Sequence, residues 1–353
     1  MTQPTAPDKP TKMIRNDALT GLRGIAALIV ALGHISNQGL LPGWMGHGFE
    51  QIGVMIFFVL SAYLMTELYL LKDFRRHNIA YATARIGRVF PLYYAIVLIS
   101  LFFTGISAWR YQFPTLLDAV LALCMISAPY ELWAVPVEVQ FYLLFAVIWM
   151  TRSTTRLLKT RLHLCITLFT VWIVCVAITL AKRKAGMEIG GLNLYIHFFI
   201  IGMLCSVFSD SIISFLSTDR HKTARWVLPV LAIISLIACI QPLRATFHVD
   251  VPTRGDPVAV LASFFVFLST VNRLGPFDWL GSKFMVWLGD ISYGFYLIHH
   301  IVLTALITYF RPSGGLYETA IILVVTVIIA QFSLYAFERP ASRLIRSFGN
   351  TTN

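Results

Sequence analysis

The amino-acid sequence predicts an all-α protein, a polytopic transmembrane helical bundle. The 353-residue chain is 57% hydrophobic and only 13% charged, and its mean hydropathy is +0.73. Because soluble proteins carry about twice that fraction of charged residues, the composition excludes a soluble globular enzyme. Apolar runs of the roughly 20 residues that cross a bilayer as a helix recur along the chain. These runs lack the alternation of apolar and polar residues that is typical of membrane β-strands.

Ten transmembrane spans are predicted from these runs, with ends placed to within several residues. They cover residues 20–37, 50–71, 89–108, 137–151, 163–181, 192–210, 225–242, 257–272, 284–309 and 316–337. The run 114–130 is too short and too interrupted for another span, so we expect a re-entrant half-helix. Such segments exist at membrane depth only where they are buried in protein or line a cavity. Because this one leads into Glu131, Trp133 and Glu138, a cavity is expected there.

The distribution of basic residues fixes the predicted topology. With the N-terminus inside, the outer loops hold seven Lys and Arg residues, namely Arg110, Lys182, Arg183, Lys184, Arg244, Arg254 and Arg311. The other 21 of the 28 lie on the cytoplasmic side. This bias follows the positive-inside rule, so both termini are predicted to be cytoplasmic. The net charge of +11 is therefore explained by topology and does not indicate nucleic acid.

Three segments are expected along the chain. Residues 1–18 are rich in Pro, Thr and Lys and are expected to form a disordered cytoplasmic tail. They lack the apolar core of a signal peptide, so the first span is expected to be an uncleaved anchor. Residues 19–338 form the predicted membrane domain, and residues 339–353 a cytoplasmic C-terminal tail. The five cysteines lie within apolar runs without zinc or disulfide spacing, and we interpret them as packing residues.

Ionisable side chains within apolar spans are costly to bury, so each indicates a functional site. Arg23 and His34 lie in the first span, eleven residues or about three helical turns apart. Their side chains therefore share one face, with roughly 16 Å of rise between them. The alternative is that Arg23 extends to the interface from the helix end and that His34 is a hydrogen-bonded core residue.

Glu138 is predicted at the outer end of the fourth span, at the depth of His34. A carboxylate there can orient a neutral imidazole, which is then a competent general base toward a hydroxyl. This pair has the chemistry for acyl transfer to an alcohol, and the alternative is that Glu138 caps the helix. Glu131, nearer the re-entrant turn, is a weaker candidate.

Two further polar groups of residues stand out. Arg85 and Arg88 lie three residues apart at the cytoplasmic mouth of the third span and suit phosphate groups, although ordinary positive-inside charge is the alternative. The ninth span carries many polar groups, which are Asp290, Ser292, Tyr293, Tyr296, His299 and His300. Adjacent helical residues point about 100° apart, so at most one of the two histidines is expected to face a given partner. A metal pair would need i, i+4 spacing, so no metal site is predicted.

Together these segments resemble the acyltransferase-3 family of integral membrane acyltransferases. Six motifs occur in the order of that family, across nearly the whole chain. They are Arg-x10-His at Arg23 and His34; FFVLSAYLM, with Ser61 and with Ala62 in place of the family's glycine; RIGRVFPLYY, with Arg85, Arg88 and Pro91; WAVPVEVQFYLLF, with Trp133 and Glu138; SYGFYLIH, with Tyr293 and His299; and FERPASR, with Glu338.

The resemblance implies a membrane O-acyltransferase of the short form, without the soluble esterase-like domain that some relatives carry. It implies transfer of an acyl group, most commonly acetyl, from cytoplasmic acyl-CoA to a hydroxyl of an extracytoplasmic glycan or lipid-linked sugar, such as lipopolysaccharide O-antigen. The implied location is a bacterial inner membrane. Acetyl-CoA would be a co-substrate, with no tightly bound cofactor, no metal and no nucleic-acid partner.

The resemblance also implies residue roles. His34 would be the catalytic base, with Glu138 and Arg23 assisting, and Arg85 and Arg88 would bind acyl-CoA. The residues expected to line the substrate site or to support it are Ser61, Trp133, Tyr293, His299 and Glu338. Two alternatives stay open, namely an enzyme of the same family that acts on a cytoplasmic small molecule and a secondary transporter. A transporter would show internal repeats, which we do not find in this sequence.

Overall fold

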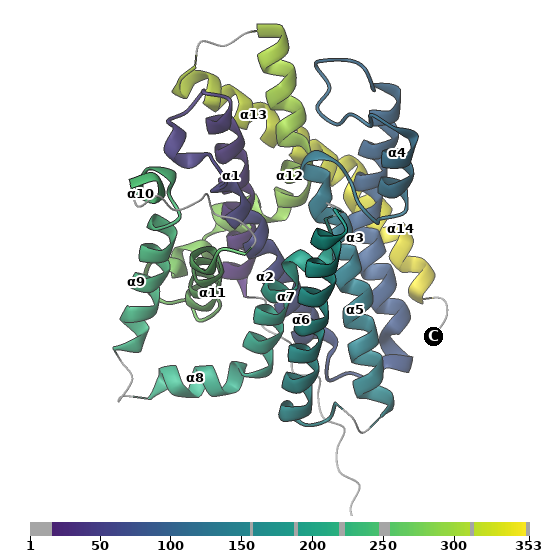
Figure 1. Cartoon of the computed structure of the whole chain (residues 1–353), viewed down its shortest axis with the longest axis vertical. Helices are drawn as coiled ribbons and strands as arrows, with labels where there is room; N and C mark the ends of the chain where they lie inside the picture. Colours follow the sequence, from purple (N-terminus) through teal and green to yellow (C-terminus); the bar gives the residue numbers. More distant parts are fainter. Residues whose placement is uncertain are drawn as a thin grey trace, which may run out of the picture.

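The structure is a computed structural model that describes residues 16–155, 158–186, 190–218, 223–246, 255–310 and 314–350. These residues form helices and contain no strand, so the predicted all-α fold is confirmed. The long helices are α1 (Asp17–Asn37), α2 (Glu50–Tyr69), α3 (Phe74–Phe102), α5 (Ala134–Thr154), α6 (Arg161–Lys184), α7 (Leu192–Val207), α9 (Ala224–Ile237), α11 (Pro257–Val271), α12 (Lys283–Phe310) and α13 (Leu316–Ser333). Shorter elements are η1 (Gly43–Met45), α4 (Leu116–Leu123), η2 (Tyr130–Trp133), α8 (Ser209–Ser217), α10 (Gln241–Thr246), η4 (Gly275–Gly281), η5 (Leu334–Glu338) and α14 (Arg339–Asn350). Figure 1 shows their arrangement.

The helices have the length and composition of membrane spans. Within the described ranges, seven are long and apolar enough to cross a bilayer, and up to nine spans result if each bent pair counts as one. The bent pairs are α7 with α8, at 63°, and α11 with η4, at 68°, and α9 is a shorter apolar helix. The polytopic membrane bundle is therefore confirmed, while the number ten and the cytoplasmic location of the termini stay predictions.

Some element ends differ from the sequence expectation. α1 begins at Asp17, because the Asn16 side chain accepts a hydrogen bond from the Ala18 amide and caps the helix, so residues 16–18 are ordered. Residues 1–15 lie outside the described part of the chain. α3 begins fifteen residues before the predicted start of the third span at residue 89, because Asp73 caps a polar first turn that hydropathy does not detect.

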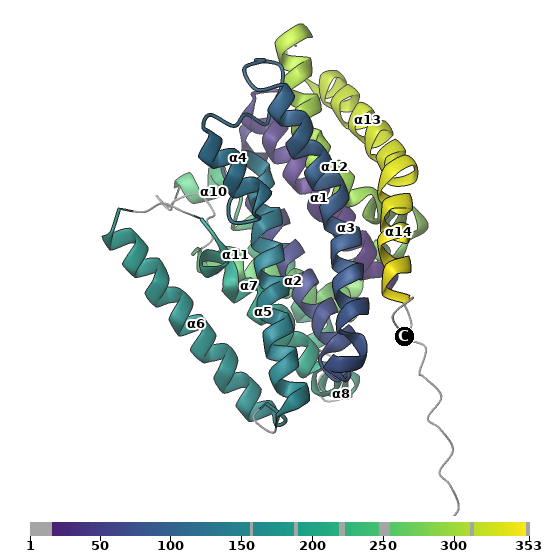
Figure 2. The same ribbon diagram turned by 90° about the vertical axis from the view of Figure 1, so that its right-hand side faces the viewer.

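The predicted C-terminal tail is a helix as far as Asn350. α13 continues through the π-helical turn η5 into α14, which lies along α3 in Figure 2. Gly87 of α3 packs against Ser342, and Thr83 packs against Gly349. Residues 339–350 are therefore part of the packed bundle.

The interrupted segment 114–130 contains the eight-residue helix α4, which Thr115 and Asp118 close with a capping box. The Tyr93 and Tyr94 hydroxyls on α3 donate to carbonyl oxygens at the end of α4, at 3.0 Å each. The following turn, η2, buries Glu131 beside a cavity of about 160 Å³ that Trp133 also lines. The expected cavity is therefore confirmed, and insertion of 114–130 into the bilayer stays a prediction.

Glycines allow α1 to pack tightly between α2 and α12. A Cβ on Gly289 of α12 would overlap the carbonyl oxygen of Thr20, and one on Gly53 of α2 would overlap that of Ala26. Membrane helices associate through such close packing because lipid supplies no hydrophobic driving force between them.

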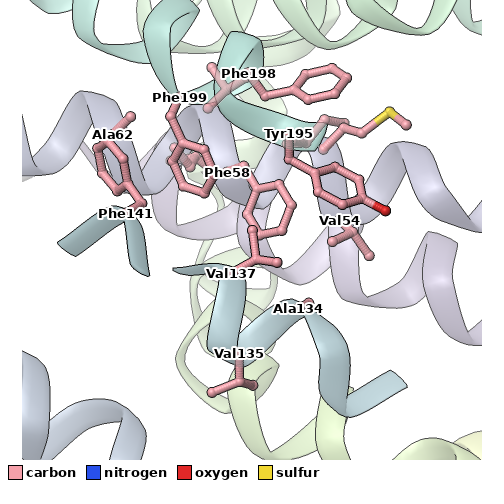
Figure 3. Packing of buried hydrophobic residues seen from close by; sticks show 14 of the residues in the cluster. Val54, Phe58, Ala62, Ala134, Val135, Val137, Phe141, Tyr195, Phe198 and Phe199 are labelled. Carbon is pink, nitrogen blue, oxygen red and sulfur yellow. The ribbon is translucent and has the colours of Figure 1, made fainter. Parts of the chain in front are cut away.

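Aromatic side chains fill the space between α2, α5 and α7. Figure 3 shows Phe58, Phe141 and Phe199 in this layer, all buried. The Phe199 ring stacks on Phe141 with centroids 4.2 Å apart and on Phe58 at 4.7 Å. In contrast, α6 exposes apolar side chains such as Leu162 and Phe169, as expected for a helix that faces lipid.

Replacing Gly289 with Ala is expected to destabilise the protein, because the new methyl group forces α1 and α12 apart. The cost is about 1–3 kcal/mol, typical of overpacking, although alanine has the higher helix propensity. Thermal unfolding of the purified protein, followed by size-exclusion chromatography after heating, measures the change. Gly190→Ala is the control, since no atom lies within 4 Å of the added Cβ. A Gly289→Ala protein as heat-resistant as the wild type would contradict this packing analysis.

Candidate active site

Three adjoining cavities follow α1 through the bundle. The arginine cavity, about 640 Å³, is lined by residues from α1, α2, α3 and α8 among others. The middle cavity, about 50 Å³, shares Arg23 and Arg88 with it. The histidine cavity, about 160 Å³, shares Val54 and Tyr296 with the middle cavity. The three cavities therefore follow one another from the arginines to His34.

The arginine cavity brings together Arg23 of α1 with Arg85 and Arg88 of α3, which the sequence analysis treated as separate groups. The buried Nε of Arg85 has no hydrogen-bond partner among the described residues, and its guanidinium lies 5.7 Å from the centroid of the Tyr142 ring. Two carboxylates, Glu67 and Asp290, also line this cavity. Three guanidinium groups around one space, with one buried donor unsatisfied, favour an anionic ligand.

Glu138 lies in the middle cavity and not beside His34. Its carboxylate accepts hydrogen bonds from the Ser61 hydroxyl and from the Tyr142 hydroxyl, the latter at 2.5 Å, and it shares the cavity with Arg23. The predicted pairing of His34 with Glu138 is therefore wrong. Glu131 is the carboxylate that lies beside His34. It precedes Glu138 by seven residues, so the two carboxylates are separated by two helical turns, or about 10 Å along a helix.

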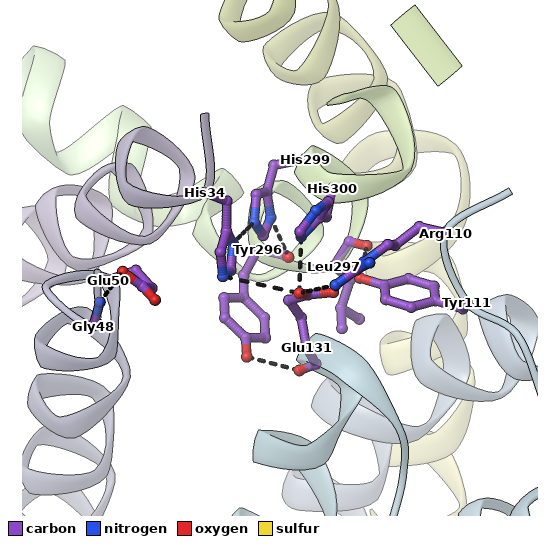
Figure 4. Close-up of polar contacts among 10 residues, drawn as sticks. All are labelled: His34, Gly48, Glu50, Arg110, Tyr111, Glu131, Tyr296, Leu297, His299 and His300. Carbon is purple, nitrogen blue, oxygen red and sulfur yellow. Dashed lines mark hydrogen bonds and ion pairs between the residues drawn. The ribbon is translucent and has the colours of Figure 1, made fainter. Parts of the chain in front are cut away.

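The tautomer of His34 follows from its hydrogen bonds, drawn in Figure 4. His299 Nδ1 lies 2.6 Å from the Tyr296 carbonyl oxygen, which can only accept, so this nitrogen carries the proton. In the neutral ring, His299 Nε2 then accepts from His34 Nδ1, at 2.9 Å. His34 consequently presents the lone pair of Nε2, which lies 3.8 Å from Glu131 Oε1. An imidazole in this tautomer, beside a carboxylate and a cavity, is arranged as a general base.

Glu131 is held by several partners at once. Arg110 donates two hydrogen bonds to it, Nε to Oε2 at 3.2 Å and Nη2 to Oε1 at 3.0 Å. His300 Nδ1 lies 2.8 Å from Oε1, and the Tyr296 hydroxyl donates to the Glu131 backbone oxygen at 2.7 Å. These contacts offset the cost of burying the carboxylate and fix its direction toward α1.

Both histidines of α12 contact His34, so the expectation that only one would face a given partner is wrong. The His34 ring centroid lies 5.2 Å from that of His299 and 4.6 Å from that of His300. Because α1 packs so closely on α12, the imidazole of His34 contacts both His299 and His300, although these two side chains point in different directions from α12. One ligand atom from each of the three histidines lies within 4.8 Å of the others, and such a set could hold a metal ion.

The remaining predicted residues have distinct places. Trp133 lines the histidine cavity and stacks on Tyr195 with centroids 4.7 Å apart. Tyr293 lines the middle cavity, and its hydroxyl donates to the Val89 carbonyl oxygen at 2.6 Å. Glu338 lies in η5, accepts from Ser333 at 2.9 Å, and is not among the residues lining the three cavities.

The sequence analysis did not assign a role in the site to two residues that the structure places there. Arg110 was only counted among the outer-loop charges, and His300 was noted for its polarity without a role. The high polarity of the ninth span indicated the region, but contacts between α12, η2 and the loop before α4 are visible only in three dimensions.

Comparison with known proteins identifies the family over most of the chain. The acyltransferase-3 family model, described as an acyltransferase domain, matches residues 16–335. A protein of Staphylococcus aureus strain MSSA476, provisionally named an O-acetyltransferase, is 25% identical over 374 aligned residues, which cover 94% of this chain and 58% of that protein. O-acetyltransferase OatA of S. aureus strain NCTC 8325 / PS 47 is 24% identical over 353 residues, which cover 91% of this chain and 56% of OatA.

The chain thus spans less than two thirds of the length of these curated relatives. No solved structure matches it significantly. The family match nevertheless extends over most of the 353 residues and includes all three cavities. The protein therefore belongs to the acyltransferase-3 family of integral membrane acyltransferases.

Proposed function

We propose that this membrane protein is an O-acetyltransferase that moves an acetyl group from acetyl-CoA, bound at the arginine cavity, to a hydroxyl of a glycan at His34. The observation that carries the proposal is the series of cavities between the three arginines and the free lone pair of His34 Nε2. The family and the names of the relatives support O-acyl transfer.

The arginine cavity suits the donor. Arg85 and Arg88 would hold the phosphate groups of acetyl-CoA, because planar guanidinium groups form paired charge-assisted hydrogen bonds with phosphate. Arg23 lines both the arginine cavity and the middle cavity, where it would contact the pantetheine arm. The rise from Arg23 to His34 is roughly 16 Å along α1, comparable to that arm when extended.

His34 would act where the two substrates meet. Its Nε2 would accept the hydroxyl proton while the hydroxyl oxygen attacks the thioester carbonyl; the C–S bond then breaks and CoA leaves as the thiolate, which takes the proton from the imidazolium. Glu131 would stabilise that imidazolium, and His299 would keep the tautomer. Prior transfer of the acetyl group to His34 is the alternative order of steps.

The acceptor is proposed to be an extracytoplasmic glycan or lipid-linked sugar, such as lipopolysaccharide O-antigen, at a bacterial inner membrane. The positive-inside bias supports this, because it puts the α8 end of the bundle in the cytoplasm and His34 toward the outside. An enzyme acting on a cytoplasmic small molecule would instead need its acceptor to reach His34 from the arginine side.

Replacing His34 with Ala is expected to reduce acetyl transfer at least about 100-fold, since the general base is lost. Incorporation of labelled acetyl from acetyl-CoA into cell-envelope glycan, at matched membrane levels, measures this. His77→Ala is the control, because His77 lies near the start of α3, distant in sequence from all three histidines of the site. Equal labelling by wild type and His34→Ala would refute His34 as the base, and no labelling by either would favour a different donor or a transporter.

Replacing Glu131 with Gln is expected to lower kcat about 10- to 100-fold, because the amide has no charge to stabilise the imidazolium. Gln has the shape of Glu and keeps one of the two oxygens that accept from Arg110, and a thermal unfolding measurement on the variant checks that the fold is retained. Steady-state kinetics measure kcat and KM for acetyl-CoA, and the latter is expected to stay unchanged. The matched comparison is Glu138→Gln; a kcat loss confined to Glu138→Gln would restore the pairing that the structure replaced.

Replacing Arg85 or Arg88 with Ala is expected to raise KM for acetyl-CoA at least about 10-fold, since each guanidinium loses charged hydrogen bonds to phosphate. Acetyl-pantetheine, which lacks these phosphates, should be used by the wild type and both variants at the same rate. Arg75→Ala, on the same helix but outside the cavities, serves as control. An equal loss with both donors would mean that these arginines support the fold and not the donor.

A further inference from the structure

The three histidines of the site form a cluster that the proposed reaction does not fully use. We propose that His34, His299 and His300 are a binding site for Zn²⁺ or a similar borderline divalent transition metal, and that metal bound there stops His34 from acting as a base. The binding site stands on geometry alone, whereas the inhibition rests on the proposed function.

The ligand set suits such a metal. Neutral imidazole nitrogens are common zinc ligands, and a tetrahedral site with Zn–N distances of about 2.0–2.1 Å separates its nitrogens by about 3.4 Å. The nitrogens here lie within 4.8 Å of one another, and His34 Nδ1 lies 2.9 Å from His299 Nε2. Small rotations of the rings therefore bring three nitrogens to coordination distance. The spacing of the two histidines on α12 did not predict this, because the third comes from α1.

The surroundings supply what a metal site needs beyond its ligands. Glu131 Oε1 lies 2.8 Å from His300 Nδ1, so a metal on the other nitrogen of His300 would complete a carboxylate–histidine–metal arrangement. The buried negative charge also offsets the charge of the cation. The histidine cavity borders the cluster at His34, and a water molecule that reaches the metal from it would be the fourth ligand.

The hydrogen bonds of His34 determine how a bound metal would affect its role as a base. The proton on His34 Nδ1 is shared with His299 Nε2, and a metal between these nitrogens takes its place. The neutral ring then carries its single proton on Nε2, after a shift through water, and no group is oxidised or reduced. A protonated Nε2 cannot accept the hydroxyl proton, so metal binding and catalysis exclude each other.

Direct binding tests the site without reference to activity. The full chain, purified without a histidine tag and reconstituted in nanodiscs, is dialysed against Zn²⁺ and its metal content is measured; Co²⁺ is used in parallel for its visible absorption. We expect one Zn²⁺ per chain that is lost, or bound at least 100-fold more weakly, in His299→Gln and in His300→Gln, with an unchanged His77→Gln control. A wild type that binds no more Zn²⁺ than these variants, or a Co²⁺ spectrum without four-coordinate bands, would overturn the site.

Inhibition is measured separately. Zn²⁺ is expected to inhibit acetyl transfer with half-maximal effect near the measured Kd, and a chelator should restore the full rate. Zn²⁺ that binds without slowing transfer would overturn the inhibition and leave the site. Should the metal-free protein show no transfer at all, the proposed function fails, while the dialysis result still decides whether the metal site exists.

Discussion

The close approach of α1 to α12 is the constraint on which the site depends. Gly289 and Thr20 meet without an intervening side chain, and this contact sets the distance between two helices that carry many polar groups of the site. Arg23 and His34 come from one helix, and Tyr296, His299 and His300 from the other. In a bilayer such a distance is maintained by van der Waals packing, since helices gain nothing there from hydrophobic exclusion of water. Gly289 therefore sets the distances between the polar side chains of the site without contributing a side chain itself.

A second constraint is the placement of one buried carboxylate. Glu131 is presented by the short turn η2, and its oxygens are shared between Arg110 and the histidines. Burying an ion is costly unless its partners are in place, so the loop that carries Arg110, the turn η2 and α12 must assemble together. The same carboxylate serves the imidazolium in the proposed transfer and the second shell of the proposed metal site. One residue thus links the stability of this end of the bundle to both proposed activities.

Sequence reasoning located the helices well and their contacts less well. Each predicted span overlaps a helix, because a helix that crosses a bilayer needs an apolar run of about 20 residues, which hydropathy detects. Arg23 and the pair Arg85 and Arg88 were predicted as separate parts of the site, and they line one cavity. Glu138 was assigned to His34 because both were expected at the same depth, but depth does not specify which helix face a side chain occupies. The contact of His34 with His299 and His300 depends on the distance between α1 and α12. The spacing of residues within one helix does not predict that distance. Likewise α3 and α14 extend beyond their apolar cores, where capping and packing decide the helix ends.

The small volume of the middle cavity has a consequence for the cell's energy supply. An enzyme with solvent-filled cavities toward both faces of a membrane risks carrying protons down the electrochemical gradient along a chain of water molecules. Here the middle cavity has a volume of only about 50 Å³, which holds only a few waters. Val54, Phe57 and Phe58 form apolar parts of its wall, and Arg23, Arg88 and Glu138 are its charged lining residues. A narrow organic chain that enters this space displaces those waters instead of adding to them. In the proposed transfer, the constriction would thus admit a substrate arm while limiting the leakage of ions, so that the membrane stays charged during the reaction.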